Sequence, residues 1–174
     1  MPVGIVLRRI SATAAEALRA RRIPADVRVA ADYPTEFSFG VGQHAGGDGA
    51  LGPFFLHRLE DDVVVGEIGG GLVAAGVVEI GYAVVASCWG RGYATEAVRA
   101  LLQRAVAVPG LARIIAHAPL DRPASGRVLE KAGFALVGEE QDDNDGVPIR
   151  VNRWEHVVPQ GVGIEMRRDS TAGR

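Results

Sequence analysis

The sequence predicts an α/β domain built on a mixed, mostly antiparallel sheet. A chain of 174 residues has the size of a single domain with a sizeable core. Three apolar segments, residues 54–59, 63–75 and 77–85, follow one another with tight turns between them, which is typical of an antiparallel meander. The third segment leads through a glycine turn into a strongly periodic helix over residues 95–108, and this pattern adds a crossover to the sheet.

Composition limits the classes of partner. Hydrophobic residues make up 48% and charged residues 23% of the chain, as in ordinary soluble proteins. The net charge of −2 gives no electrostatic reason to expect nucleic acid. Cys88 is the single cysteine and cannot form an internal disulfide. No apolar run reaches the roughly 20 residues that cross a bilayer. We therefore expect a cytoplasmic protein without a nucleic-acid or membrane partner.

The N-terminal segment predicts one strand and two helices. Residues 3–10 alternate weakly between apolar and polar side chains and predict a first strand. Ser11 or Thr13 can cap an alanine-rich helix over residues 12–21. A proline just before residues 25–31 permits a second short helix there.

A glycine-rich segment follows. Residues 37–53 contain six glycines and predict a loop, with a short helical piece near Phe37. This loop either shapes a substrate site or is a simple connector. In the meander that comes next, the strand over residues 63–68 is interrupted or bent by the glycines at 69–71 and resumes at 72–75.

The helix over residues 95–108 carries apolar residues every three or four positions and ends at the Pro-Gly pair 109–110. A short strand follows at residues 112–117. Because strand–helix–strand crossovers are right-handed, this strand is expected to lie parallel to residues 77–85.

The C-terminal part predicts one more helix and two strands. Ser125 can cap a helix over residues 126–132, and Gly133 stands at the position that closes a helix. A strand, an acidic hairpin loop and a last strand follow at residues 134–137, 139–145 and 149–158. We expect one domain over residues 1–159 and a polar tail over residues 160–174.

The turn Gly90-Arg91-Gly92 is the strongest local signal for a ligand. It joins a strand to a helix, and glycine lets the backbone come close to a ligand. The first turn of a helix has unpaired N–H groups and partial positive charge, which together favour phosphate. Many such turns only connect elements. The Walker and dinucleotide motifs are absent, so a nucleotide-binding domain is a weaker alternative.

Residues 89–94, Trp-Gly-Arg-Gly-Tyr-Ala, resemble the pyrophosphate loop of the GNAT superfamily of N-acetyltransferases, Gln/Arg-x-x-Gly-x-Gly/Ala, with Trp89 at the first position. The longer string Trp-Gly-Arg-Gly-Tyr-Ala-Thr-Glu-Ala is similar to a Rim-type subgroup related to ribosomal-protein N-terminal acetyltransferases. Residues 77–84, 124–134 and, less specifically, 33–36 also resemble this family. The resemblance covers residues 63–158 well and the first sixty loosely.

The resemblance implies a GNAT fold whose sheet splays open to hold acetyl-CoA. The pantetheine arm would pair with the backbone at Tyr82, Ala83 and Val84, as a peptide adds to a strand edge. The pyrophosphate would rest on Gly90, Arg91, Gly92, Tyr93, Ala94 and Thr95. Arg91 either adds charge there or is a solvated turn residue.

Direct attack of an amine on a thioester needs a base. Glu79 is the leading candidate, because it sits in an apolar strand where burial would raise the pKa of its carboxyl toward neutrality. The alternative is a carboxylate that only faces solvent. Glu67 is the second candidate. His117 either relays a proton or is structural.

The leaving thiolate needs a proton donor. Many relatives use a tyrosine where this chain has Leu129, and the resembling subgroup offers the serine that matches Ser125. Ser125 could also be a helix cap, and the two roles are compatible. Arg122 stands where relatives carry a cofactor-orienting asparagine. Tyr82 or Tyr93 could donate instead.

These features predict an acetyl-CoA-dependent N-acetyltransferase acting on a primary amine, either a protein N-terminus or a small molecule. The alternative is a binding module that keeps the acyl-CoA site but has lost turnover. The apolar residues of the last strand would permit a homodimer. No metal site is expected, since the histidines at 44, 57, 117 and 156 lack ligand spacing.

Overall fold

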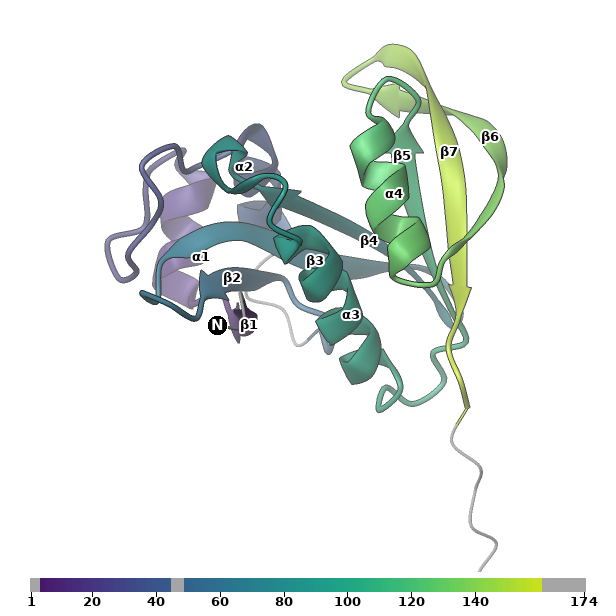
Figure 1. Cartoon of the computed structure of the whole chain (residues 1–174), viewed down its shortest axis with the longest axis horizontal. Coiled ribbons are helices and arrows are strands. Elements are labelled where there is room, and N and C mark those ends of the chain that lie inside the picture. The colour runs from purple at the N-terminus through teal and green to yellow at the C-terminus, as the bar shows by residue number, and fades with distance from the viewer. Residues whose placement is uncertain (1–3, 45–48, 161–174) are drawn as a thin grey trace, which may run out of the picture.

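The computed structural model describes residues 4–44 and 49–160, in which one seven-stranded sheet is flanked by helices (Figure 1). The strands are β1 Ile5–Arg9, β2 Phe54–Arg58, β3 Val64–Ala74, β4 Val77–Val84, β5 Arg113–Pro119, β6 Ala135–Asn144 and β7 Val147–Val157. The helices are α1 Ala12–Arg19, α2 Glu36–His44, α3 Tyr93–Ala105 and α4 Pro123–Lys131, with a short 3₁₀ turn at Ala86–Cys88.

The strand order is β1-β2-β3-β4-β5-β7-β6. All neighbours are antiparallel except β4 and β5, which run parallel. The predicted α/β class with a mixed, mostly antiparallel sheet is confirmed. So is the parallel crossover, in which α3 carries the chain from β4 to β5.

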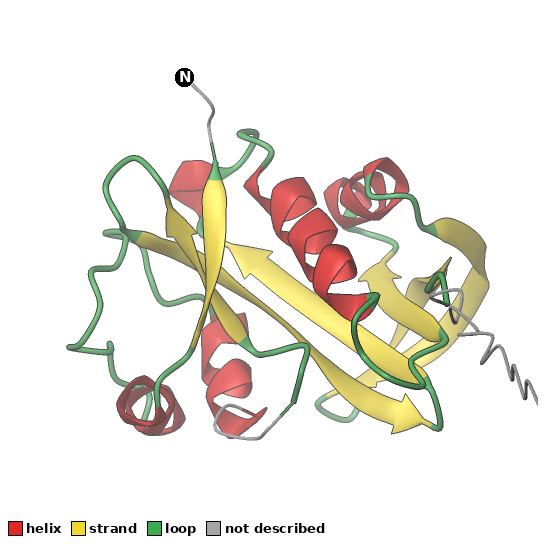
Figure 2. Ribbon diagram, turned by 90° about the horizontal axis from the view of Figure 1, so that it is seen from below, coloured by secondary structure: helices red, strands yellow, loops and turns green. Residues whose placement is uncertain are grey.

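The sheet separates two pairs of helices (Figure 2). Helix α2 covers one face, where the Phe37 ring lies against Gly81 of β4, and α1 packs on α2 where Leu18 meets Gly42. Helices α3 and α4 cover the other face. The α3 stripe of Ala97, Val98, Leu101 and Ala105 is fully buried there, as its spacing predicts.

The parallel pair β4–β5 separates after three residue pairs. Its register runs from Val77 opposite Arg113 to Glu79 opposite Ile115 and then stops, although both strands continue. Each strand keeps a partner on its other side, β3 for β4 and β7 for β5. The sheet therefore opens toward the ends of β4 and β5, as Figure 1 shows. We call this feature the β4–β5 opening.

One expectation for the N-terminal half is wrong. Residues 25–31 form no helix; Val29 makes an isolated bridge to Val64, because valines at alternating positions pack as extended backbone. The helical piece expected near Phe37 is confirmed as the nine-residue helix α2, which occupies more of the glycine-rich segment than predicted. Gly42 is needed there, since an added Cβ would lie 2.7 Å from the Leu18 Cβ atom. Ser11 caps α1 as predicted, accepting from the Ala14 N–H.

The expected acidic loop at residues 139–145 is also wrong, because β6 runs through it to Asn144. Cross-strand ion pairs to β7 hold these acidic residues in extended backbone. The turn itself is Asp145-Gly146, both with positive φ.

Helix α4 begins at Pro123, so Ser125 lies inside its first turn and does not cap it. Gly133 follows the helix with φ +94°, as predicted. Gln160, the first residue of the expected tail, bonds to the Leu111 carbonyl, and the rest of the tail lies outside the described residues.

Gly66 offers a direct test of how closely β3 and β4 approach. A Cβ atom there would lie 2.0 Å from the Ala83 carbonyl oxygen, whereas a Cβ at Gly71 of the same strand meets nothing within 4 Å. We expect Gly66→Ala to lower the free energy of unfolding by about 2 kcal/mol, the scale of overpacking a core. Urea unfolding measures it. Gly71→Ala is the control, and an equal loss in both variants would contradict the close approach.

Candidate active site

The glycine turn before α3 has the backbone that a bound anion requires. Gly90 and Gly92 have φ values of +73° and +81°, and no atom lies within 4 Å of an added Cβ at either one. Gly92 is the N-cap of α3 and provides no side-chain cap. The N–H groups of Tyr93, Ala94 and Thr95 are the first three of the helix, which have no acceptor within a helix.

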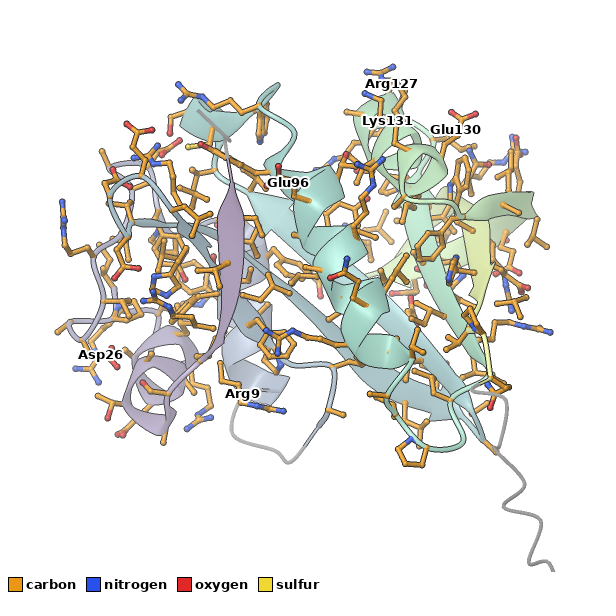
Figure 3. The ribbon with its side chains drawn as sticks, turned by 60° about the horizontal axis from the view of Figure 1, so that its bottom comes forward. Arg9, Asp26, Glu96, Arg127, Glu130 and Lys131 are labelled. Atoms are coloured by element: carbon orange, nitrogen blue, oxygen red, sulfur yellow. The ribbon has the colours of Figure 1, made fainter. Side chains whose placement is uncertain are left out.

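Glu96 is the acidic residue of this first turn and would repel an anion. Its carboxylate is turned to β1 instead, where Oε2 accepts the Ile5 N–H at 3.2 Å (Figure 3). Arg91 is exposed in the turn. The start of α3 is therefore suited to hold a phosphate group, with Arg91 within the turn itself.

Trp89 takes one of the backbone groups assigned to the cofactor. Its indole Nε1–H donates to the Val84 carbonyl at 2.7 Å, while 71% of the residue stays exposed. From sequence, Trp89 is a departure from the general family pattern that the Rim-type subgroup shares, and this contact was not expected. The Val84 carbonyl, one of the backbone groups expected to bind the pantetheine arm, is therefore already hydrogen-bonded to the Trp89 side chain.

Tyr82 spans the β4–β5 opening. Its hydroxyl donates to the Ser125 carbonyl at 3.0 Å and so connects β4 to the first turn of α4. Burial raises the pKa of the Tyr82 hydroxyl, which therefore stays protonated and able to donate. Tyr82 and Ser125, both predicted site residues, are thus brought together on the α3–α4 side of the sheet.

Glu79 and His117 meet where β4 and β5 separate. Their side chains project on the opposite face, the one that carries α2, and Glu79 Oε1 lies 2.7 Å from His117 Nδ1. The other ring nitrogen, Nε2, lies 3.1 Å from Glu140 Oε2 of β6. The imidazole is therefore held between two carboxylates, each of which is about 40% exposed. Sequence reasoning did not find Glu140, because it was assigned to a loop.

Burial lowers the pKa of His117, but the hydrogen bonds and charges of Glu79 and Glu140 outweigh it, so the net pKa is raised above the ordinary value. Arg153 of β7 extends the cluster. It bonds to Glu140 at 3.3 Å and to Glu155 at 2.7 Å. Five charges of alternating sign thus run from Glu155 to Glu79.

Glu67 lies apart from this cluster. It pairs with Ala83 in the sheet, four residues beyond Glu79, and is fully buried beneath α2. The Tyr33 hydroxyl donates to its Oε1 atom, and Oε2 has no hydrogen-bond partner among the described residues. Burial raises the pKa of Glu67, while the Ser38 and Tyr33 hydroxyls oppose part of that shift.

The remaining predicted residues are divided between core and surface. Leu129 is a buried core residue of α4, and Arg122 is the exposed N-cap of that helix. Tyr93 is buried at the start of α3, and Ser125 is half-buried. On the outer side of α4, Figure 3 shows the charged side chains Arg127, Glu130 and Lys131.

A hollow of about 580 Å³ lies between the β5–α4 loop and the β6–β7 turn. It is lined by Asp121, Arg122 and Arg150 among others, and Glu79 is not part of it. Within residues 4–44 and 49–160, no group of three acidic, histidine or cysteine side chains is arranged to hold a metal ion. In the same ranges, no helix is long and apolar enough to cross a membrane.

Comparison with known proteins agrees with this geometry. A family profile described as "Acetyltransferase (GNAT) domain" matches residues 5–135. The chain belongs to the GNAT acetyltransferase family. It has the α/β GNAT fold, and acetyl-CoA-dependent N-acetylation is general for this family.

Among curated proteins, the uncharacterized N-acetyltransferase YoaA of Bacillus subtilis is 32% identical to this chain over 84 residues. The aligned segment makes up 47% of this chain. The chain spans about half the length of that relative, 48%.

Solved structures share the fold at low identity. The ribosomal L7/L12 alpha-N-protein acetyltransferase RimL in complex with coenzyme A aligns with a TM-score of 0.66 and 18% identity, over 90% of this chain and 97% of that one. A spermidine N-acetyltransferase SpeG chimera from Vibrio cholerae aligns with a TM-score of 0.64 and 16% identity, over 88% and 95%. Neighbours thus include Rim-type enzymes and others, so the subgroup is not distinguished.

The charge cluster predicts a pH-dependent contribution to stability. The folded pKa of His117 is raised, so the ion pairs with Glu79 and Glu140 stabilise fully below the unfolded pKa of about 6.5 and are lost as pH rises through the folded value. We expect the wild type to lose free energy of unfolding relative to His117→Gln between about pH 6 and pH 9. Urea unfolding across this range measures it. A difference independent of pH would contradict the ion pairing.

Proposed function

We propose that this protein is an acetyl-CoA-dependent N-acetyltransferase that acetylates a primary amine, with Glu79 and His117 as its proton-accepting pair. The observation that carries the proposal is the β4–β5 opening. The glycine turn of α3 lies at the end of β4 on one side, and the Glu79–His117 pair marks the point where the strands separate.

The residues present fit the cofactor. We assign the pyrophosphate to the N–H groups at the start of α3 and the pantetheine arm to the backbone of Tyr82, because the Ala83 carbonyl points to Gly66 of β3 instead. Since Trp89 bonds to the Val84 carbonyl, that group is open to the arm only if the indole moves. When bound, acetyl-CoA supplies an activated thioester carbonyl.

Glu79 is assigned the removal of a proton from the acceptor amine, directly or through one water. It is partly exposed on the α2 face and its Oε1 atom lies 2.7 Å from His117 Nδ1, so a proton taken by its carboxylate has an adjacent acceptor when the imidazole is neutral. The complete burial of Glu67 favours Glu79 over it, because a base must reach its substrate.

Ser125 is assigned as the donor that protonates the leaving thiolate. The serine is half-buried in the first turn of α4, and its backbone carbonyl holds the Tyr82 hydroxyl across the opening. Tyr82 remains the second candidate for this donor role, because its raised pKa keeps the hydroxyl protonated.

The acceptor class is taken from relatives of the same fold. RimL acts on the α-amine of ribosomal protein L7/L12 and SpeG on spermidine, as their names state. The α2 face, which carries Glu79 and His117, is where we assign the acceptor. A protein N-terminus and a small-molecule amine both offer the primary amine that this chemistry needs.

Ligand-dependent unfolding tests the cofactor. Acetyl-CoA at about a hundred times its dissociation constant should add about 2.7 kcal/mol to the free energy of unfolding, and ADP and NAD should add less. Gly92→Ala should weaken acetyl-CoA binding about tenfold, since a side chain at φ +81° costs roughly 1–2 kcal/mol. Gly146→Ala is the control, with φ +82° in the distant β6–β7 turn. Absence of any shift with CoA species would refute the site.

Replacement of Glu79 tests the chemistry. Glu79→Gln keeps the size of the side chain but removes the carboxylate, so kcat for the best acceptor in an amine panel should fall about a hundredfold. The dissociation constant of acetyl-CoA should stay unchanged. Unaltered kcat would remove Glu79 from the mechanism. A wild type that binds acetyl-CoA but acetylates no amine would instead support the impaired binding module.

A further inference from the structure

Glu140 occupies a position that the acetyl-transfer mechanism above does not use. It lies on β6, next to the β7 strand that pairs with β5, and it reaches the face of the sheet that carries His117. Its Oε2 atom is 3.1 Å from His117 Nε2, on the side of the ring away from Glu79. The imidazole therefore has a carboxylate at each nitrogen.

This arrangement decides where the ring keeps its last proton. With both carboxylates ionised, both nitrogens donate and the ring is an imidazolium. When the ring loses one proton, only one of its two nitrogens can still donate a hydrogen bond, either Nδ1 to Glu79 or Nε2 to Glu140. Glu140 is held as an anion by Arg153, which Glu155 holds in turn. Among the described residues, Glu79 has no ion-pair or hydrogen-bond partner besides His117.

We propose that Glu140 is a positioning residue that keeps a proton on Nε2 of His117, so that Nδ1 receives the proton that Glu79 takes from the acceptor amine. This inference rests on the proposed function. As the new C–N bond forms, the C–S bond of the thioester would break and the leaving thiolate would take a proton from the Ser125 hydroxyl, while the amine N–H bond breaks and its proton passes to the Glu79 carboxylate and then to Nδ1. The Nε2–H bond to Glu140 is unchanged throughout, as a tautomer-fixing carboxylate requires.

The charged groups that face His117 come from three strands. They are Glu79 of β4, Glu140 of β6, and Arg153 with Glu155 of β7. Loss of the Glu140 charge removes one of the two carboxylates that stabilise the imidazolium. It also leaves Arg153 paired with Glu155 alone. The pKa of His117 should then fall, and Glu79, the carboxylate that remains, should draw the proton of the neutral ring to Nδ1.

Glu140→Gln is the test variant and Glu139→Gln is its matched control. Glu139 is the neighbouring residue, equally charged and partly exposed, and it pairs with Arg150 instead of His117. Nitrogen NMR of histidine-labelled protein reports the ring directly and needs no acceptor. We expect the wild type and Glu139→Gln to hold the neutral ring as the Nε2–H tautomer. Glu140→Gln should shift the neutral ring toward the Nδ1–H tautomer and show a lower pKa of His117.

The kinetic readout uses the same two variants. We expect kcat of Glu140→Gln to fall about tenfold, part of what acid–base catalysis contributes, with an unchanged KM for acetyl-CoA. Because the neutral ring is the active form, the acid limb of its pH–rate profile should move to lower pH. Glu140→Asp should recover part of the rate. Glu140→Gln behaving like Glu139→Gln in the tautomer or in kcat would overturn the proposal.

The two proposals fail in different experiments. If the wild type acetylates no amine, the proposed function fails, and with it the catalytic use of the relay, whatever the ring does. If the wild type is active and its neutral His117 carries the proton on Nδ1, the function stands and the role of Glu140 is refuted.

Discussion

The separation of β4 from β5 is the constraint on which the rest of the structure depends. Three residue pairs join these parallel strands before the pairing ends, and each strand has its full complement of partners on its other side. An opening between two otherwise paired strands gives access to backbone groups without leaving the sheet an unstable free edge. Both the glycine turn before α3 and the Glu79–His117 pair take their places from this separation.

The elements around the opening were predictable from sequence, because strong local signals determine them. The periodicity of α3, the glycines at 90 and 92 and the apolar run of β4 all fold as expected. Segments held by distant partners were missed. Val29 makes a bridge to Val64 where a helix was expected, and arginines of β7 pair with acidic residues of β6 where a loop was expected. Local propensity is weak where contacts from far along the chain decide the conformation.

The same distinction applies to the site. Glu79 and His117 could be named because each belongs to an apolar strand that the sequence marks clearly, but their 2.7 Å contact depends on the register of two strands that the sequence does not encode locally. Glu140 and Trp89 reach the opening through side-chain contacts with no sequence pattern of their own. Glu67 looked like a rival base in sequence, and only its complete burial distinguishes it from Glu79.

The short β4–β5 pairing also divides the seven-stranded sheet into two units that only three residue pairs join. One unit holds β1 to β4 with α1 and α2, and the other holds β5 to β7 with α4. Besides the three residue pairs, three side-chain contacts connect the units. They are the Tyr82 hydroxyl to the Ser125 carbonyl, Glu79 to His117, and Arg99 to the Lys131 carbonyl. Side chains thus supply much of the connection between the two units, so substitution at these contacts should loosen the β4–β5 opening while the strands within each unit stay paired.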